Sequence, residues 1–155
     1  MCHKRTKRDS RNQATSCVPE TIIDSLRLGY NILMSIPREI QGQKYVRLTT
    51  FRKNGEVVHT PVWFGEEGNG LFVMTRSDSG KCKRIRNNPQ VRIAPCTIRG
   101  RVTGAAFVAS TRILPPEDWP RARQAIQKKY WLTRIPFLWS KKNVYLQIES
   151  FVPNG

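Results

Sequence analysis

The part of the chain best suited to binding chemistry is a run of polar and basic residues, RSDSGKCKR at positions 76–84, that directly follows an apolar stretch. A helix opening near Ser79 would present unpaired backbone N–H groups and the positive end of its dipole, and both favour a phosphate. The same region supplies four basic side chains, Lys81, Lys83, Arg84 and Arg86. A charged helix start is as typical of a solvated face as of an anion site. On these residues alone, both interpretations stay open.

Three strands are expected to position this run. The stretch KYVRLTTFRKNGEVVHTPVWF at 44–64 predicts two strands joined at Asn54-Gly55, a dipeptide that tolerates the positive φ of a tight hairpin turn. A polar turn at Glu66 to Gly70 then leads to a third strand, Leu71 to Thr75. Pro61 cannot donate to a sheet ladder, so we expect it at an edge or a bulge where backbone faces a ligand.

The helix itself should pack on one side only. Cys82 and Ile85 are three residues apart and form one apolar stripe, which leaves the basic residues to face solvent or a ligand. The helix should end at Asn87-Asn88-Pro89.

The remainder of the chain predicts further strands and helices around them. Pro115-Pro116-Glu117-Asp118 is a helix start, with acids against the positive dipole. The helix after it presents Trp119, Ala122, Ile126 and Tyr130 on one face, which we interpret as core packing. The other expected elements are strands at Gln90 to Cys96, Ala105 to Leu114 and Asn143 to Phe151, a loop at Thr97 to Gly104, and a short helix at Leu132 to Ser140. The sum is about six strands with helices outside, and closure into a small barrel would remove exposed edges.

Composition divides the chain into three parts. With 155 residues, 39% of them hydrophobic, it can bury one core but not two. Residues 1–19 form a basic tail too polar and charged to offset the cost of ordering it. Residues 20–40 predict a helix and a connection; the apolar spacing favours a packing helix over a membrane-surface one. Residues 41–155 form the main domain.

Net charge and cysteine content indicate which partners and which cellular compartment to expect. The net charge of +16 favours anionic partners. Residues 12–155 hold 22 of the basic and 10 of the acidic residues, or +12, so the excess is not confined to the tail. The chain has no membrane-length apolar run, no signal-peptide core and no CxxC spacing. We expect a reduced, cytoplasmic protein without a membrane partner.

Several motifs together resemble a known family. LTTFRKNGEVVHTPVWF, SGKCKRIRNNPQVRIAPC and RGRVTG, with RARQAIQKKYW and NVYLQIESF after them, are similar to the flavin and deazaflavin oxidoreductases related to pyridoxamine 5′-phosphate oxidase. The resemblance covers about residues 43–151 and is closest to the subgroup that depends on coenzyme F-420. It implies a mainly β (α+β) fold, a six-stranded FMN-binding split β-barrel with peripheral helices.

The resemblance also implies where a cofactor binds. The ring system would lie against the second strand, and Met74 and Thr75 would contact it from the third. Ser79, Gly80 and Lys81 match the phosphate-binding turn, and Arg76, Lys83 and Arg84 are further candidate contacts. The matching residues of the second strand are His59, Thr60, Pro61, Val62, Trp63 and Phe64. Trp63 is equally typical of a core or dimer contact.

The implied reaction is hydride transfer from reduced cofactor to an unsaturated small molecule. Coenzyme F-420 is favoured, because its oligoglutamate tail suits a +12 domain, and FMN is second. His59 has no partner acid or serine nearby in sequence, so a hydrogen-bonding role is favoured over acid–base catalysis and no catalytic residue is assigned. Pyridoxamine phosphate oxidase activity itself is not expected, because the chain ends soon after the last strand.

Partners and alternatives are indicated by the same residues. Family members usually form homodimers with the cofactor at the interface, and Trp131, Phe137, Leu138 and Trp139 offer apolar surface for one. A cofactor carrier without turnover is one alternative. A basic β-barrel that binds nucleic acid is the other, but few aromatics lie between the basic residues of 81–101 to form a stacking platform. Cys2-His3 alone cannot form a tetrahedral metal site.

Overall fold

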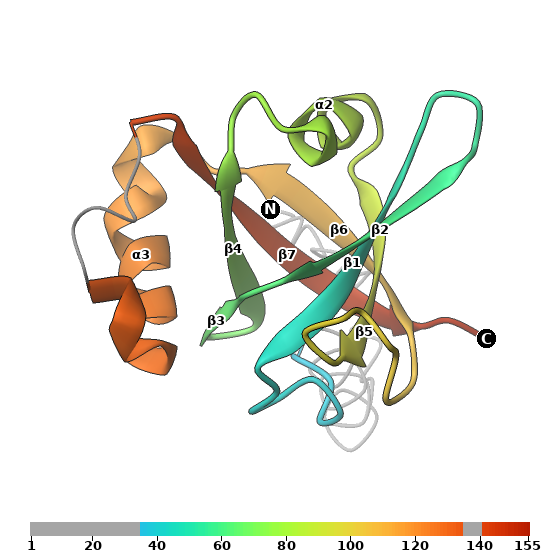
Figure 1. The fold of residues 1–155 in the computed structure, drawn as a ribbon, viewed down its shortest axis with the longest axis horizontal. Coiled ribbons are helices and arrows are strands. Elements are labelled where there is room, and N and C mark those ends of the chain that lie inside the picture. The colour runs from blue at the N-terminus through green and yellow to red at the C-terminus, as the bar shows by residue number, and fades with distance from the viewer. Residues whose placement is uncertain (1–34, 135–140) are drawn as a thin grey trace, which may run out of the picture.

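The computed structural model describes residues 35–134 and 141–155. Seven strands form one antiparallel sheet in the order β2-β1-β5-β6-β7-β4-β3, which curls into an open barrel (Figure 1). The strands are β1 Tyr45–Phe51, β2 Val57–Val62, β3 Gly65–Glu67, β4 Gly70–Arg76, β5 Gln90–Cys96, β6 Phe107–Ile113 and β7 Asn143–Pro153. The expected split barrel with peripheral helices is therefore confirmed.

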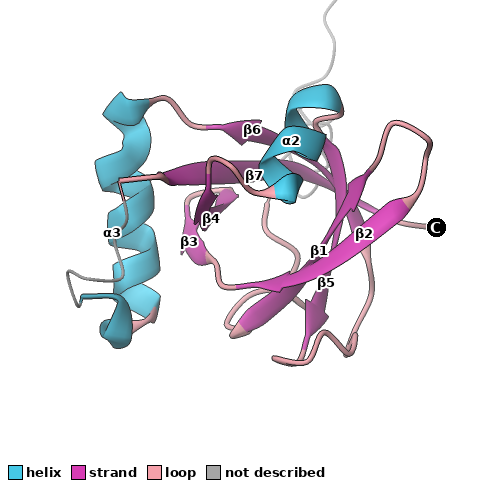
Figure 2. Ribbon diagram, turned by 45° about the horizontal axis from the view of Figure 1, so that its top comes forward, coloured by secondary structure: helices cyan, strands magenta, loops and turns pink. Residues whose placement is uncertain are grey.

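Two α-helices within the described residues flank the sheet. Helix α2, Gly80–Asn87, contacts β1 and β6, and helix α3, Trp119–Lys129, packs along β3, β4 and β7 (Figure 2). Short 3-10 turns lie at Pro116–Asp118 and Trp131–Arg134. No helix in the described ranges combines the length and the apolar character needed to cross a membrane.

The first hairpin forms as predicted. Phe51 pairs with Val57, and the connection between them contains Gly55 at φ 84°. The backbone N–H of Arg52 donates to the carbonyl of Glu56 at 2.8 Å, which closes the turn. The Asn54-Gly55 prediction is confirmed, because glycine supplies the positive φ there at no steric cost.

The described residues form seven strands, not six, and the expected polar turn from Glu66 to Gly70 is wrong except at Gly68 and Asn69. Residues 65–67 form β3, which pairs with β4 through Gly65 and Phe72, and only Gly68 and Asn69 make the turn. The sequence GEE has no apolar alternation to indicate a strand. Tertiary contact specifies it instead, because β3 packs against both β4 and α3.

Other boundaries shift slightly. The strand expected at Ala105 to Leu114 spans Phe107–Ile113, and the last strand extends two residues further, to Pro153. Of the short helix expected at Leu132 to Ser140, only the 3-10 turn at Trp131–Arg134 is described. The rest of that prediction, and those for residues 1–34, lie outside the described residues.

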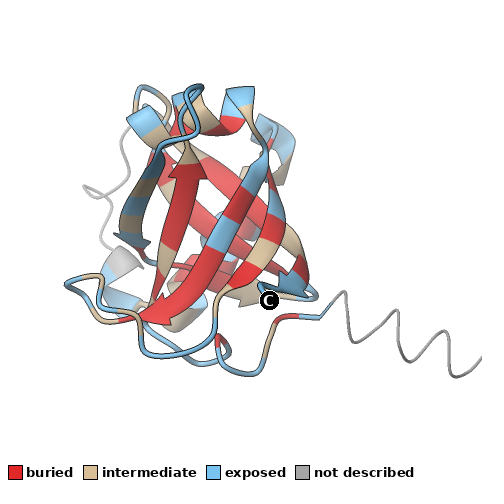
Figure 3. Ribbon diagram, turned by 90° about the vertical axis from the view of Figure 1, so that its right-hand side faces the viewer, coloured by how far each residue is buried: buried red, intermediate tan, exposed pale blue. Residues whose placement is uncertain are grey.

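The core fills the barrel and continues under α3. Buried and more exposed residues alternate along β2 and β6, whereas β4 is buried over most of its length, and Figure 3 shows both patterns. Ala122 and Ile126 of α3 are buried against Phe72 and Tyr145, with Trp119 and Tyr130 packed at the margin. The predicted apolar face of this helix is thus confirmed. The inner cluster includes Val46, Leu48, Phe64, Leu71, Val73, Ile85, Ile93, Leu146 and Ile148.

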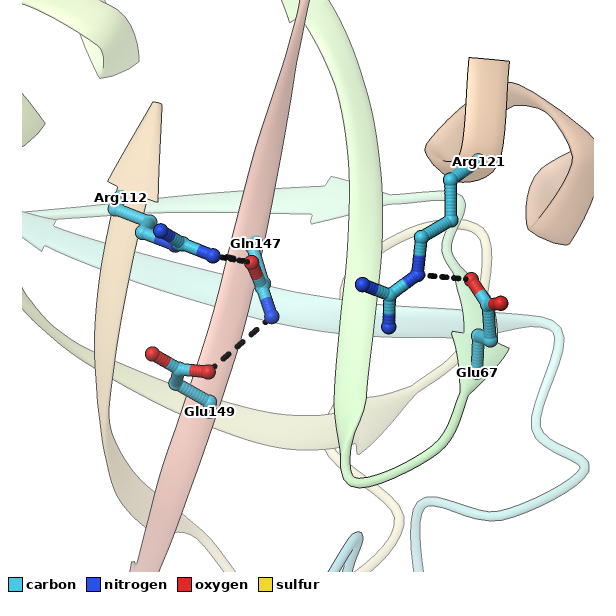
Figure 4. A network of polar contacts seen from close by, with 5 residues as sticks. All are labelled: Glu67, Arg112, Arg121, Gln147 and Glu149. Carbon is cyan, nitrogen blue, oxygen red and sulfur yellow. Dashed lines mark hydrogen bonds and ion pairs between the residues drawn. The ribbon is translucent and has the colours of Figure 1, made fainter. Parts of the chain in front are cut away.

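Polar side chains link neighbouring elements on the outside of the barrel (Figure 4). The Arg112 guanidinium donates to Gln147 Oε1 from Nε at 3.0 Å and from Nη2 at 2.6 Å, and Gln147 donates to Glu149 at 3.2 Å. Arg121 of α3 pairs with Glu67 of β3 at 2.9 Å. Because both members of that last pair are exposed, it contributes little to holding α3 against the sheet.

Burial of Tyr145 predicts a stability loss in alkali. Burial raises the pKa of this phenol to about 12 from the ordinary 10.0. The unfolded chain therefore releases its proton first, and the stabilisation, complete below pH 10, is lost as pH rises to 12. At about 1.4 kcal/mol per pKa unit, Tyr145 should contribute about 3 kcal/mol to the complete loss, of which about 2 kcal/mol is reached by pH 11.5. Urea unfolding at pH 8 to 11.5 should show a shallower decline for Tyr145→Phe than for wild type; parallel curves would contradict the assignment.

Candidate functional site

A cavity of about 280 Å³ lies where the curled sheet does not close. Strand β2 is at one end of the sheet order and β4 is next to the other end, and side chains from both line it. The start of α2 and the later part of α3 complete the wall. Its lining residues are Pro61, Val62, Trp63, Met74, Lys81 and Ile126. Five of these six are residues that the sequence predicted for a site.

Pro61 lies on an edge strand, as predicted. β2 pairs with β1 only, and Pro61 is opposite Arg47 in that pair. A proline costs no ladder bond on the free side of an edge strand. β2 therefore has main-chain polar groups on its unpaired side, and its last two residues, Pro61 and Val62, line the cavity.

The start of α2 is fixed to the end of β4. The Ser79 hydroxyl accepts a hydrogen bond from the Cys82 backbone N–H at 3.4 Å, so Ser79 is the N-cap that the sequence indicated. The same hydroxyl lies 3.2 Å from Thr75 Oγ1, at the end of the strand. Cys82 and Ile85 are buried, which orients the helix. The first turn of α2 is therefore held in one position relative to the cavity.

Lys81 brings a positive charge onto an apolar wall. Its side chain lines the cavity and is half-buried, and burial lowers the pKa of its ammonium group. None of the ion pairs among residues 35–134 and 141–155 includes Lys81. A cation that has lost hydration without gaining a counter-ion is a good recipient for a ligand anion.

Arg84 adds a second cation beside the first turn of α2. Its Nε donates to Thr50 Oγ1 of β1 at 2.7 Å. Its Nη1 lies 2.9 Å from the point that a Cβ on Gly80 would occupy, so glycine leaves the room that the guanidinium uses. Burial and the charge of Arg52 lower the pKa of Arg84. Thr50, which anchors this arginine, was not predicted, because it is 34 positions away and carries no motif.

The other predicted site residues do not line the cavity. His59 is exposed and its Nδ1 lies 2.8 Å from Thr49 Oγ1. Thr75 is buried, and Arg76 is held by both oxygens of Asp78 at 2.8 and 3.0 Å. The remaining four positions are Thr60 in the middle of β2, buried Phe64 after it, and Gly80 and exposed Lys83 in α2.

Besides Thr50, two more residues near the site were not predicted from the sequence. Ile126 of α3 is buried and forms part of the cavity wall. Its apolar spacing predicted burial but not which partner it would meet. Arg47, opposite Pro61, has an Nε that is buried without a hydrogen-bond partner among the described residues. A single arginine in a predicted strand does not indicate that its Nε will be buried without a hydrogen-bond partner.

Comparison with known proteins gives one family and one fold. Residues 36–135 match the family model described as pyridoxamine 5′-phosphate oxidase. No curated protein matches the chain.

Solved structures with the same fold are distant in sequence. The heme storage protein HutZ from Vibrio cholerae is 16% identical, with a TM-score of 0.59, covering 74% of this chain and 84% of its own. A proposed 5-nitroimidazole antibiotic resistance protein from Bacteroides thetaiotaomicron is 16% identical, with a TM-score of 0.55 and coverages of 83% and 80%. An FAD-binding protein from Mesorhizobium loti is 16% identical, with a TM-score of 0.52 and coverages of 81% and 87%. At this identity they show the shared fold alone.

Proposed function

The chain belongs to the pyridoxamine 5′-phosphate oxidase family, and from that premise we propose that it is an oxidoreductase that binds a phosphorylated flavin or deazaflavin in the cavity between β2, β4 and α2. The cofactor, when bound, supplies the centre that gives up hydride to an unsaturated small molecule. The protein would bind the cofactor, orient its ring and keep water away from it.

The observation that carries this proposal is the setting of Lys81. A half-buried ammonium that forms no ion pair among the described residues lies at the start of a capped helix, on a cavity whose other walls are apolar. A ligand with a phosphate and a flat apolar ring fits that donor set. The phosphate would meet the first turn of α2 with Lys81 and Arg84, while Val62, Trp63 and Met74 would exclude water from the ring.

Between cofactors, we propose coenzyme F-420 first and FMN second. Both have a ring and a phosphate, but F-420 continues into an anionic oligoglutamate tail. Arg99 and Arg101 are exposed and belong to none of the described ion pairs. They flank Gly100, where an added Cβ would lie 3.8 Å from the ring of Pro61. This positive charge beside the cavity supports an extended anionic ligand more than a short one.

Parallel titrations test the proposal. We expect the purified protein to quench F-420 fluorescence saturably at micromolar protein, with weaker quenching of FMN. Hemin belongs in the same series, since HutZ is a heme storage protein. Tight binding of FMN alone would move the protein to the flavin branch. Binding of hemin alone, or of none of the three, would overturn the oxidoreductase proposal and make nucleic-acid binding the next assay.

The assembly and location are also proposals. We propose a homodimer with the cofactor at its interface, as is usual in the family. We also propose a cytoplasmic location, which agrees with the reduced cysteines expected from the sequence. Of the apolar residues that the sequence offered for a dimer, Trp131 is described and is 71% exposed. Phe137, Leu138 and Trp139 lie outside the described residues.

A further inference from the structure

The outer face of strands β2, β1 and β5 carries positive charge that no acidic residue of these strands offsets. The three strands are neighbours in the sheet (Figure 1). Neither they nor the loop at 97–104 after β5 contains Asp or Glu. None of the ion pairs among residues 35–134 and 141–155 lies on these segments. The basic side chains and the histidine that they hold are Arg47, His59, Arg92, Arg99 and Arg101.

The strand register places three of these side chains on one face. His59 of β2 and Arg92 of β5 are both opposite Thr49 of β1. Arg47 is two residues before Thr49 on β1, so it points to the same side. Leu48, between them, belongs to the inner cluster. The shared side of His59, Arg47 and Arg92 is therefore the outside of the barrel.

The turn after β5 brings its two arginines to the same face. The Thr97 N–H donates to the Arg101 carbonyl at 2.9 Å and the Gly100 N–H to the Thr97 carbonyl at 2.8 Å, which fixes the turn. A Cβ on Gly100 would lie 3.8 Å from the Pro61 ring. Because Pro61 is opposite Arg47, and β1 lies between β5 and β2, the turn extends across β1 on this face.

One of the arginines has a donor that the protein leaves unsatisfied. The Nε of Arg47 is buried and has no hydrogen-bond partner among the described residues. A buried donor without an acceptor is unfavourable. A guanidinium carries five N–H donors in all, and oxygens of an anion are strong acceptors for them. Arg47 is therefore better satisfied with an anion beside it than without one.

Aromatic rings lie at both ends of β1 on this face. Tyr45 and Phe51 are the first and last residues of the strand and alternate in step with Arg47, so they point outward too. The Arg92 guanidinium lies over the Phe51 ring, 5.5 Å from its centroid. Unpaired bases stack on aromatic rings and on guanidinium planes. Residues 81–101 hold no aromatic side chain of their own, but the sheet places these two rings beside the arginines of that segment.

From these observations we propose that the outer face of β2, β1 and β5 binds single-stranded nucleic acid. The arginines contact phosphates, and the rings of Tyr45 and Phe51 stack on bases. A single strand fits better than a duplex, because stacking on the protein needs unpaired bases. A second copy of this chain fits poorly, since a two-fold contact of this face with itself would bring the arginines of both copies together. The inference goes beyond the proposed function and needs no cofactor.

Fluorescence anisotropy of a labelled oligothymidylate, titrated with the purified protein, tests the proposal. An abasic strand of equal length keeps the phosphates and lacks the bases, so it is the matched ligand. We expect it to bind about tenfold more weakly, on the scale of one base stack. Oligouridylate is titrated in parallel, because DNA and RNA share the phosphates and base faces that this surface would contact. Binding of either supports the proposal, and the tighter one tells DNA from RNA.

Two variants separate this face from general positive charge. Arg92→Gln should weaken oligothymidylate binding about fivefold and reduce the slope of log K against log salt by about 0.7, the effect of one phosphate contact. Arg86→Gln is the control, since Arg86 is also exposed and outside the described ion pairs but lies on α2. We expect it to weaken binding less than about twofold. Phe51→Leu keeps an apolar side chain and should weaken binding of oligothymidylate about tenfold without affecting the abasic strand.

The outcomes that would overturn the proposal are specific. They are equal binding of oligothymidylate and the abasic strand, or equal losses in Arg92→Gln and Arg86→Gln. A change of oligomeric state in Arg92→Gln, measured by light scattering, would also overturn it, because the face would then be a contact between copies.

Titration with FMN keeps this proposal apart from the proposed function. FMN has no long anionic tail, so Arg92→Gln should leave its binding unchanged. Nucleic-acid binding without binding of F-420 or FMN would support this face while the oxidoreductase proposal fails. Cofactor binding without nucleic-acid binding at moderate salt would overturn this inference alone.

Discussion

Replacing Lys81 with Ala is expected to weaken cofactor binding about a hundredfold. The ammonium group lines the cavity and is half-buried, and this burial lowers its pKa. A hydrogen bond to a charged partner contributes roughly 1.5–3 kcal/mol, and its upper end corresponds to about two powers of ten in Kd. Fluorescence titration of wild type and variant at one salt concentration measures the change.

Lys83→Ala is the matched control. It removes the same charge from the same helix, but its side chain is exposed and does not line the cavity. We expect Lys83→Ala to weaken cofactor binding less than about threefold, the effect of removing a screened surface charge. Similar losses in both variants would mean that the ligand responds to general positive charge, and the assignment of Lys81 to the anion site would be wrong.

Replacing Gly65 with Ala is expected to lower the free energy of unfolding by about 3 kcal/mol, at the upper end for overpacking. A Cβ there would lie 2.5 Å from the carbonyl carbon of Ala125 and 2.5 Å from the amide nitrogen of Ile126. Both atoms belong to the backbone of α3, so a change of side-chain rotamer cannot relieve the overlap. Either β3 or the helix has to move. For a chain of this length the melting temperature should fall by roughly 10 °C.

Gly68→Ala on the same hairpin separates steric overlap from backbone strain. Gly68 has φ 58°, but nothing lies within 4 Å of its added Cβ. We expect Gly68→Ala to lower the free energy of unfolding by about 1 kcal/mol, the cost of a non-glycine residue in the left-handed region. If Gly65→Ala melts no lower than Gly68→Ala, then α3 does not pack against β3 as closely as the structure shows. Because Ile126 lines the cofactor cavity, Gly65→Ala should also weaken cofactor binding where it still folds.

Local signals predicted the parts of this fold whose cause is local. Asn54-Gly55 needs only its own backbone preference to make a hairpin, and Ser79 needs only the next turn of chain to cap a helix. Pro61 could be placed on an edge strand because a missing N–H excludes it from a central one. In each case the residue's own chemistry decides the structure.

Features that depend on distant partners could not be predicted in this way. The strand at Gly65–Glu67 exists because β4 and α3 lie on its two sides, and its own residues suggest a turn. Ile126 was correctly expected to be buried, but its place on the cavity depends on how α3 crosses the sheet. Arg84 donates a hydrogen bond to Thr50 although the two residues are 34 positions apart, and neither residue type predicts the other as its partner. The resemblance to a family gave candidate positions, and the fold separated those on the cavity from His59, Arg76 and Lys83.

The strand order has a consequence for how the protein is made. β7 lies between β6 and β4 in the sheet, with Leu71 paired to Ile148 and Arg76 to Asn143. Until residues 143–153 have left the ribosome, β4 has, among the described strands, only the three-residue β3 to pair with, and Met74 lacks its partner Tyr145. The hairpin of β1 and β2 can form early during translation, whereas the cavity it borders cannot assemble until the last strand has been synthesised.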